Sequence, residues 1–106
     1  MPKFLVQGRY TAAGLNGLLK EKASGRKAAV QAAVKSVKGK MDCLYFGSSG
    51  TDVVMIIDVP DSAAAAALSV TVGASGSVEL HVTPLMTVEE MDGALGLATK
   101  YRAPGA

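Results

Sequence analysis

His81 and Arg9 are the two residues best suited to acid–base chemistry, and each falls in a predicted strand. His81 is the single histidine of the chain, and histidine is the residue type that titrates nearest neutrality. Glu79 lies two residues before it in an alternating segment, so the two share one face of a strand. In this setting His81 is a candidate general base, and Arg9 a candidate clamp for a substrate carboxylate or enolate.

A second group of side chains has the chemistry to line a ligand site beside this pair. Tyr45 or Thr83 could orient a substrate, and the remaining candidates for ligand binding are Gln7, Glu79 and Asp52. A structural interpretation stays open and is preferred: Arg9 and Glu79 form a cross-strand ion pair or line a dimer interface, with His81 hydrogen-bonded among them. Asp52 then serves a turn, and Tyr45 belongs to the core.

Other kinds of site have no support in the residue pattern. One histidine and one cysteine on different strands, with irregularly spaced carboxylates, do not make a metal site. The glycines do not match the phosphate-binding loop patterns, so no cofactor is expected. The basic residues between Lys20 and Lys40 suit the solvated face of a helix and have no aromatic residues among them. With a net charge of only +2, nucleic acid is not an expected partner.

Size and composition predict one small domain that associates with itself. The 106 residues are 49% hydrophobic and only 19% charged, which is low for a lone small domain and favours a buried subunit interface. The single cysteine, Cys43, excludes an internal disulfide. The sequence begins without a signal pattern and has no apolar run of spanning length, so a cytoplasmic protein without membrane contact is expected.

The candidate residues must be positioned by a sheet whose central strand is the apolar run Val53–Ile57. This run is bounded by Gly50, suited to a positive φ, and by Pro60, and it predicts a strand buried on both faces. Alternation predicts three more strands, at residues 4–10, 41–47 and 78–83. In the second of these, strict alternation places Met41, Cys43 and Tyr45 on one face and Asp42, Leu44 and Phe46 on the other.

Helical spacing and capping residues predict the connections. A short helical turn, broken by glycines, follows Thr11, and a helix capped by Ser24 runs from Arg26 to Lys38, with Gly39 as its left-handed end. Asp61 caps an alanine-rich helix that Gly76 ends. Thr87 and Glu90 form a capping box for a last helix that reaches about Lys100.

The order β-α-β-β-α-β with an extra C-terminal helix predicts an α+β, ferredoxin-like fold with a four-stranded antiparallel sheet in the order 4-1-3-2. Residues 1–100 form the domain, and residues 101–106 are a flexible tail. Both crossover helices then cover one face. The other face is bare and carries Leu5, Gln7, Arg9, Leu44 or Tyr45, half of the central strand, Glu79, His81 and Thr83. Because that face is partly apolar, two sheets should pair face to face, as in dimeric α/β barrels.

The sequence also resembles the GYD-domain family over about residues 3–95. The resemblance rests on Gly50-Thr51-Asp52 before the apolar strand and on Pro60-Asp61 after it. Weaker matches are Tyr10-Thr11, Gly14, Gly17, Gly25-Arg26, Gly39, Tyr45, Gly76, Thr83-Pro84-Leu85 and Glu89-Glu90. Thr51 stands where the family usually has tyrosine, so any family function that uses this phenol would be missing. The resemblance implies a dimeric α/β-barrel type of fold and no particular reaction.

Two functions follow from this sequence. The first is a non-enzymatic homo-oligomer with a binding or assembly role, in which a small ligand between the sheet faces stays open. The alternative is a small-barrel enzyme of the isomerase or monooxygenase type, with His81 as base and Arg9 as anion clamp. An enzyme requires these two side chains to reach one solvent-accessible cavity, whereas an interface buries them in pairwise contacts.

Overall fold

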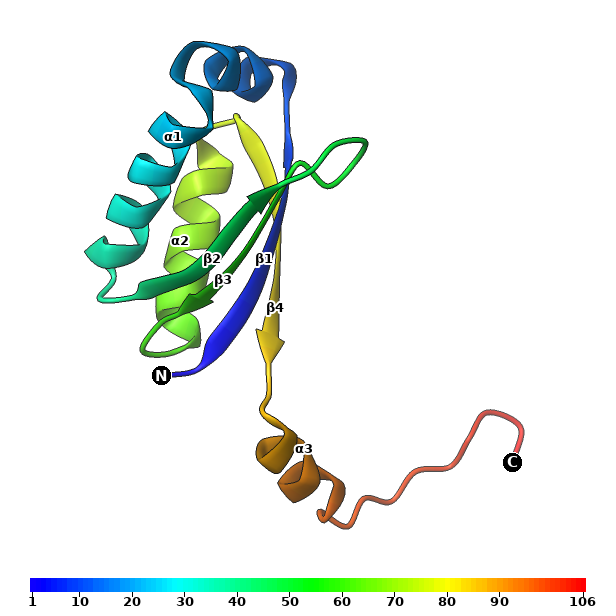
Figure 1. Ribbon diagram of the computed structural model, residues 1–106. Helices are drawn as coiled ribbons and strands as arrows, with labels where there is room; N and C mark the ends of the chain where they lie inside the picture. Colours follow the sequence, from blue (N-terminus) through cyan, green and yellow to red (C-terminus); the bar gives the residue numbers. More distant parts are fainter.

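The computed structural model describes all 106 residues and has a sheet covered by two long helices on one face (Figure 1). A third, short helix lies beyond the end of the sheet (Figure 1). The elements in chain order are β1 (Lys3–Tyr10), α1 (Ala12–Ser36), β2 (Lys40–Phe46), β3 (Val53–Asp58), α2 (Ser62–Ala74), β4 (Val78–Leu85) and α3 (Val88–Leu95). No helix is long and apolar enough to cross a membrane.

The sheet has the predicted strand order and is antiparallel throughout. Its order is β2-β3-β1-β4, with β1 hydrogen-bonded to both β3 and β4. The first and last strands are therefore neighbours, and Tyr10 pairs with Val78 at one end and Lys3 with Leu85 at the other. The ferredoxin-like arrangement expected from the sequence is confirmed.

The core lies on the helix-covered face alone. Val53, Met55 and Ile57 of β3 are buried there against Val34 of α1 and Ala65 of α2. The expectation that β3 is buried on both faces is wrong for the single chain, because Val54 and Ile56 on the opposite face are only half-buried. Only 11 of the 106 residues are buried, so the chain leaves much apolar surface uncovered.

Helix α1 consists of two helical pieces joined at a kink, as the sequence predicts, but the kink is not where the sequence places it. It starts at the N-cap Thr11, whose hydroxyl accepts a hydrogen bond from the Gly14 backbone N–H at 3.3 Å. The interruption falls at Lys22, which has φ 64° and ψ 173°, and not at Ser24, which lies inside the helix and caps nothing. The glycine-rich pattern therefore marks a kink correctly, but its position depends on backbone strain that composition does not reveal.

The left-handed residue at the end of α1 is not the predicted one. Lys38 takes the left-handed conformation, with φ 62°, and Gly39 does not. Gly39 is needed for close packing instead, because a Cβ at this position would lie 2.8 Å from the Asp58 carbonyl oxygen and 2.9 Å from the Val34 side chain. The predicted cap of α2 is confirmed: Asp61 accepts from the Ala64 N–H at 2.9 Å. Gly76 has a φ of 75° just after the same helix.

A β-bulge in β2 changes which of its side chains face the helices. The register shifts between Met41 and Cys43, so Met41 pairs with Ile57 while Cys43 pairs with Ile56. The extra residue resets the alternation. Met41 therefore joins Leu44 on the helix face, against the prediction, while Cys43 and Tyr45 lie on the open face.

The last two elements also differ from their predicted ends. Strand β4 continues through Pro84 to Leu85, because a strand at the edge of a sheet tolerates a missing N–H. Helix α3 begins with the predicted capping box of Thr87 and Glu90 but ends at Leu95, before Gly96, and not near Lys100. It has no buried residue and extends away from the sheet (Figure 1).

Candidate functional site

The open sheet face brings the predicted polar residues together on β1 and β4. Gln7 lies directly opposite His81, and Arg9 lies opposite Glu79. Leu5 is opposite Thr83 one step further along. Side chains opposite each other in an antiparallel pair have Cβ atoms about 5 Å apart, so these residues form one patch, as the sequence predicts.

Within one chain, the side chains of this patch are exposed to solvent and are not held in place by ion pairs. Arg9, Glu79, His81 and Thr83 are all exposed, and Gln7 is half-exposed. The ion pairs of the chain are Lys3–Asp42, Lys3–Asp58 and Arg26–Glu21, so the expected pair between Arg9 and Glu79 does not form. The polar patch is an open surface, and a single chain does not order it for catalysis.

An apolar stripe crosses the same face beside the polar patch. The register places Val54 between Gln7 and Tyr45, and Ile56 between Leu5 and Cys43. Tyr45 is 69% exposed and belongs to this surface, not to the core. The face therefore combines an apolar half over β2 and β3 with a polar half over β4.

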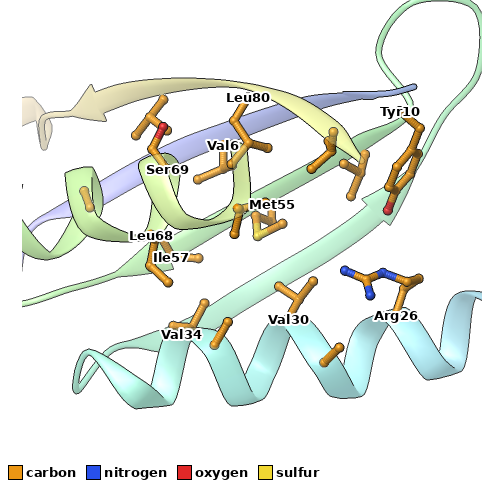
Figure 2. A pocket seen from close by; sticks show the side chains of 17 residues that line it. Val6, Tyr10, Arg26, Val30, Val34, Met55, Ile57, Leu68, Ser69 and Leu80 are labelled. Carbon is orange, nitrogen blue, oxygen red and sulfur yellow. The ribbon is translucent and has the colours of Figure 1, made fainter. Parts of the chain in front are cut away.

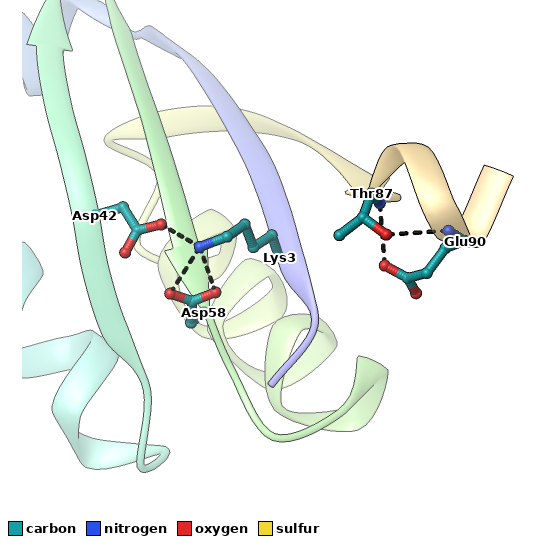
Figure 3. Close-up of polar contacts among 5 residues, drawn as sticks. All are labelled: Lys3, Asp42, Asp58, Thr87 and Glu90. Carbon is teal, nitrogen blue, oxygen red and sulfur yellow. Dashed lines mark hydrogen bonds and ion pairs between the residues drawn. The ribbon is translucent and has the colours of Figure 1, made fainter. Parts of the chain in front are cut away.

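A cluster of charged residues lies at one end of the open face. The ammonium group of Lys3 on β1 bonds Asp42 of β2 and both carboxylate oxygens of Asp58 on β3, the latter at 2.9 and 3.1 Å (Figure 3). The hydrogen bonds that Lys3 donates to Asp42 and Asp58 raise the pKa of Lys3, and the bond to Asp42 lowers the pKa of that carboxyl. This network joins three strands, and no local sequence pattern predicts it because its members are far apart in the chain.

Asp52, a predicted ligand residue, has a structural contact. Its carboxylate accepts a hydrogen bond from the Tyr10 backbone N–H at 2.9 Å, and its own N–H donates to the Gly8 carbonyl at 2.8 Å. It also lines a shallow depression between the start of α1 and the β2–β3 loop, together with Leu19 and Phe46. The hydrogen bonds tie the start of β3 to the end of β1.

A partly open cavity lies on the other face of the sheet, between the sheet and the two long helices (Figure 2). Its volume is about 100 Å³, and most of its lining is apolar. Arg26, Tyr10 and Ser69 contribute polar groups, and neither His81 nor Arg9 reaches it. The sequence contains an indication that Arg26 faces this cavity, because Arg26 lies four residues before Val30 and therefore on the apolar side of α1.

The chain contains no group of three or more histidine, cysteine, aspartate or glutamate residues that could hold a metal ion.

Comparison with known proteins identifies the family. Neither the curated proteins nor the solved structures that were searched gave a match. The model of the GYD domain matches residues 4–95, which include the sheet and all three helices. Thr51, which the resemblance leads us to expect in place of the family's tyrosine, is exposed in the β2–β3 loop. Because the match spans nearly the whole chain, the protein belongs to the GYD domain family.

Proposed function

We propose that the protein is a non-enzymatic homodimer with a binding or assembly role, formed by pairing two open sheet faces as in a dimeric α/β barrel. The observation that carries this proposal is the stripe of Val54, Ile56, Leu5 and Tyr45, which the single chain leaves open to solvent. Contiguous apolar surface of this kind is typical of protein interfaces.

The size of the face fits a specific interface. Strands of 6 to 8 residues, at about 3.4 Å per residue and four strands about 4.8 Å apart, give a plan area of roughly 500 Å² per copy. Two copies reach the roughly 1,000 Å² at which specific interfaces begin. The low burial of the chain supports the same conclusion, since only 11 of 106 residues are buried before association.

Helix α3 gives separate support for a partner. Val88, Met91 and Leu95 are all exposed, and Leu95 is 75% exposed. An eight-residue helix is marginally stable in water by itself, so α3 needs a surface to pack on. The second copy supplies that surface in the proposed dimer.

The test compares two substitutions of exposed apolar residues by lysine. Tyr45→Lys places a charge on the open face, whereas Val70→Lys places one on the outer side of α2, where Val70 is 71% exposed. We expect Tyr45→Lys to weaken the dimer by about tenfold or more, since an unpaired buried charge costs well over 1.4 kcal/mol, and Val70→Lys to leave it unchanged. Analytical ultracentrifugation over a dilution series measures both constants. A wild-type chain that is monomeric at every concentration would contradict the proposal.

The second candidate is the enzyme with His81 as base and Arg9 as anion clamp. The specific observation in its favour is the register, which places His81 beside Gln7 and Arg9 beside Glu79 on one face. The partner copy would have to supply the pocket, because the cavity between the helices and the sheet lies on the opposite face. A crystal structure of the dimer decides: the enzyme requires both side chains in one solvent-accessible cavity, and an interface buries them in pairwise contacts.

A further inference from the structure

The cavity between the helices and the sheet is independent of the open face and of the proposed dimer. Helix α1 packs over β2 and β1, and α2 packs over β4. The cavity therefore lies over the middle of the sheet, between Val6 and Met55 below and Val30 and Leu68 on the helices (Figure 2). Its volume of about 100 Å³ exceeds that of an ordinary packing defect.

Two polar groups are placed together at one end of this apolar space. Figure 2 shows the Tyr10 hydroxyl and the Arg26 guanidinium at the same end, with the Tyr10 ring directed toward Arg26, the guanidinium extending along the cavity, and Ser69 further along it. Arg26 is only 31% exposed, and its Nη1 contacts Glu21 Oε2 at 3.3 Å. A guanidinium has several N–H donors, so one such contact leaves most of them free for a ligand.

The geometry points to a binding site for a small aliphatic carboxylate, with its chain in the cavity and its carboxylate on Arg26. A guanidinium binds a carboxylate through two parallel hydrogen bonds, and the Tyr10 hydroxyl can donate a third. The apolar walls, formed largely by valine and alanine, select an alkyl chain. An apolar cavity of about 150 Å³ accommodates benzene, so a cavity of about 100 Å³ suits a short chain and excludes larger rings.

The first measurement uses pentanoate, with 1-pentanol and pentylamine as ligands of equal chain length and different charge. We expect pentanoate to shift the methyl NMR signals of Val30, Leu68 and Leu80 in the full chain. The methyl signals of Val54 and Ile56 on the open face should not move. Tighter binding of pentanoate than of the alcohol and the amine supports the site. Equal binding of all three, or shifts confined to the open face, would overturn it.

Two matched variants separate the charge of Arg26 from its ion pair. Arg26→Gln should weaken pentanoate binding by about tenfold or more, the effect of losing hydrogen bonds to a charged group, and leave 1-pentanol binding unchanged. Glu21→Gln breaks the same ion pair but keeps the guanidinium, so its pentanoate affinity should be equal to or higher than that of the wild type. Unaltered pentanoate binding in Arg26→Gln would contradict the proposal.

A third variant reduces the volume of the cavity and leaves the charges of Arg26 and Glu21 unchanged. Ala33 lines the cavity from α1, and Ala33→Leu fills part of the space. We expect this variant to lose pentanoate and pentanol binding together while the dimer constant stays that of the wild type. Because the cavity and the open face lie on opposite sides of the sheet, failure of this site and failure of the dimer give different results. Retained binding in a folded Ala33→Leu variant would place the ligand elsewhere.

Discussion

Gly14 is the residue at which the fold has least room for a side chain. A Cβ there would lie 2.0 Å from the Ser77 carbonyl oxygen, because the first turn of α1 packs against the start of β4. Gly17, in the same helix, has nothing within 4 Å of the corresponding position. The two glycines look alike in the sequence and differ only in their tertiary surroundings.

We expect Gly14→Ala and Gly17→Ala to change stability in opposite directions. Gly14→Ala should lower the free energy of unfolding by about 1–3 kcal/mol, the usual cost of overpacking. Gly17→Ala should raise it by about 0.4–1 kcal/mol, because alanine has less conformational freedom to lose in a helix. Urea unfolding of both variants at one chain concentration measures the difference. A Gly14→Ala protein as stable as the wild type would show that α1 does not pack this closely on β4.

Helix α3 is the element whose role depends most on a partner. Its capping box holds its first turn: Thr87 Oγ1 accepts from the Glu90 N–H, and Glu90 accepts from the Thr87 N–H, each at 3.0 Å (Figure 3). The second of these bonds lowers the pKa of Glu90. The start of the helix is therefore defined locally, while its apolar side has no contact that would hold it in place.

A double substitution tests whether α3 packs on the second copy. Met91→Lys with Leu95→Lys changes two residues that are exposed in the single chain, so the monomer fold should be retained. We expect the dimer dissociation constant to rise by about tenfold or more, since two unpaired charges would be buried. Gly93→Lys is the control: Gly93 lies two residues from both Met91 and Leu95, hence on the opposite side of the same helix, and has open space around it, so this change should have little effect on the dimer. Equal constants for the double variant and the wild type would remove α3 from the interface.

At the scale of the whole molecule, the Lys3 network connects the edge strand β2 to the two central strands, β3 and β1. The pKa of Asp42 is lowered, so its contribution to stability is complete above about pH 4 and is lost as the pH falls further. The pKa of Lys3 is raised, so its contribution is complete below about pH 10 and is lost at higher pH. Both effects leave a plateau of stability across neutral pH.

We expect Asp42→Asn to destabilise the protein at pH 7 and to lose this effect in acid. Below the pKa of Asp42 in the folded state, the wild-type carboxyl is protonated and resembles the amide, so the two proteins should converge in stability. Urea unfolding from pH 7 down to pH 2.5, at equal chain concentrations because a dimer's stability depends on concentration, measures the difference. A difference that stays constant over this range would mean that Asp42 does not bond Lys3 in solution.

The sequence by itself determined the elements and their order, since the signals involved are local. Alternation specified β1 and β4, and Asp61 and Thr87 capped the helices that follow them. From this order, general rules on connections predicted the strand order and one covered face, and so the patch of Arg9 and His81.

Tertiary structure decided the features that depend on close contact between distant segments. The bulge in β2 moved Met41 to the helix face, and packing on Asp58 made Gly39 necessary while Lys38 took the left-handed turn. The cavity with Arg26 at its end exists because α1 and α2 cover different strands of the same sheet face, α1 over β2 and β1 and α2 over β4, which no stretch of either helix specifies alone. The local sequence pattern determines on which face of a helix or strand a side chain lies, whereas the packing of distant segments determines which residues it contacts.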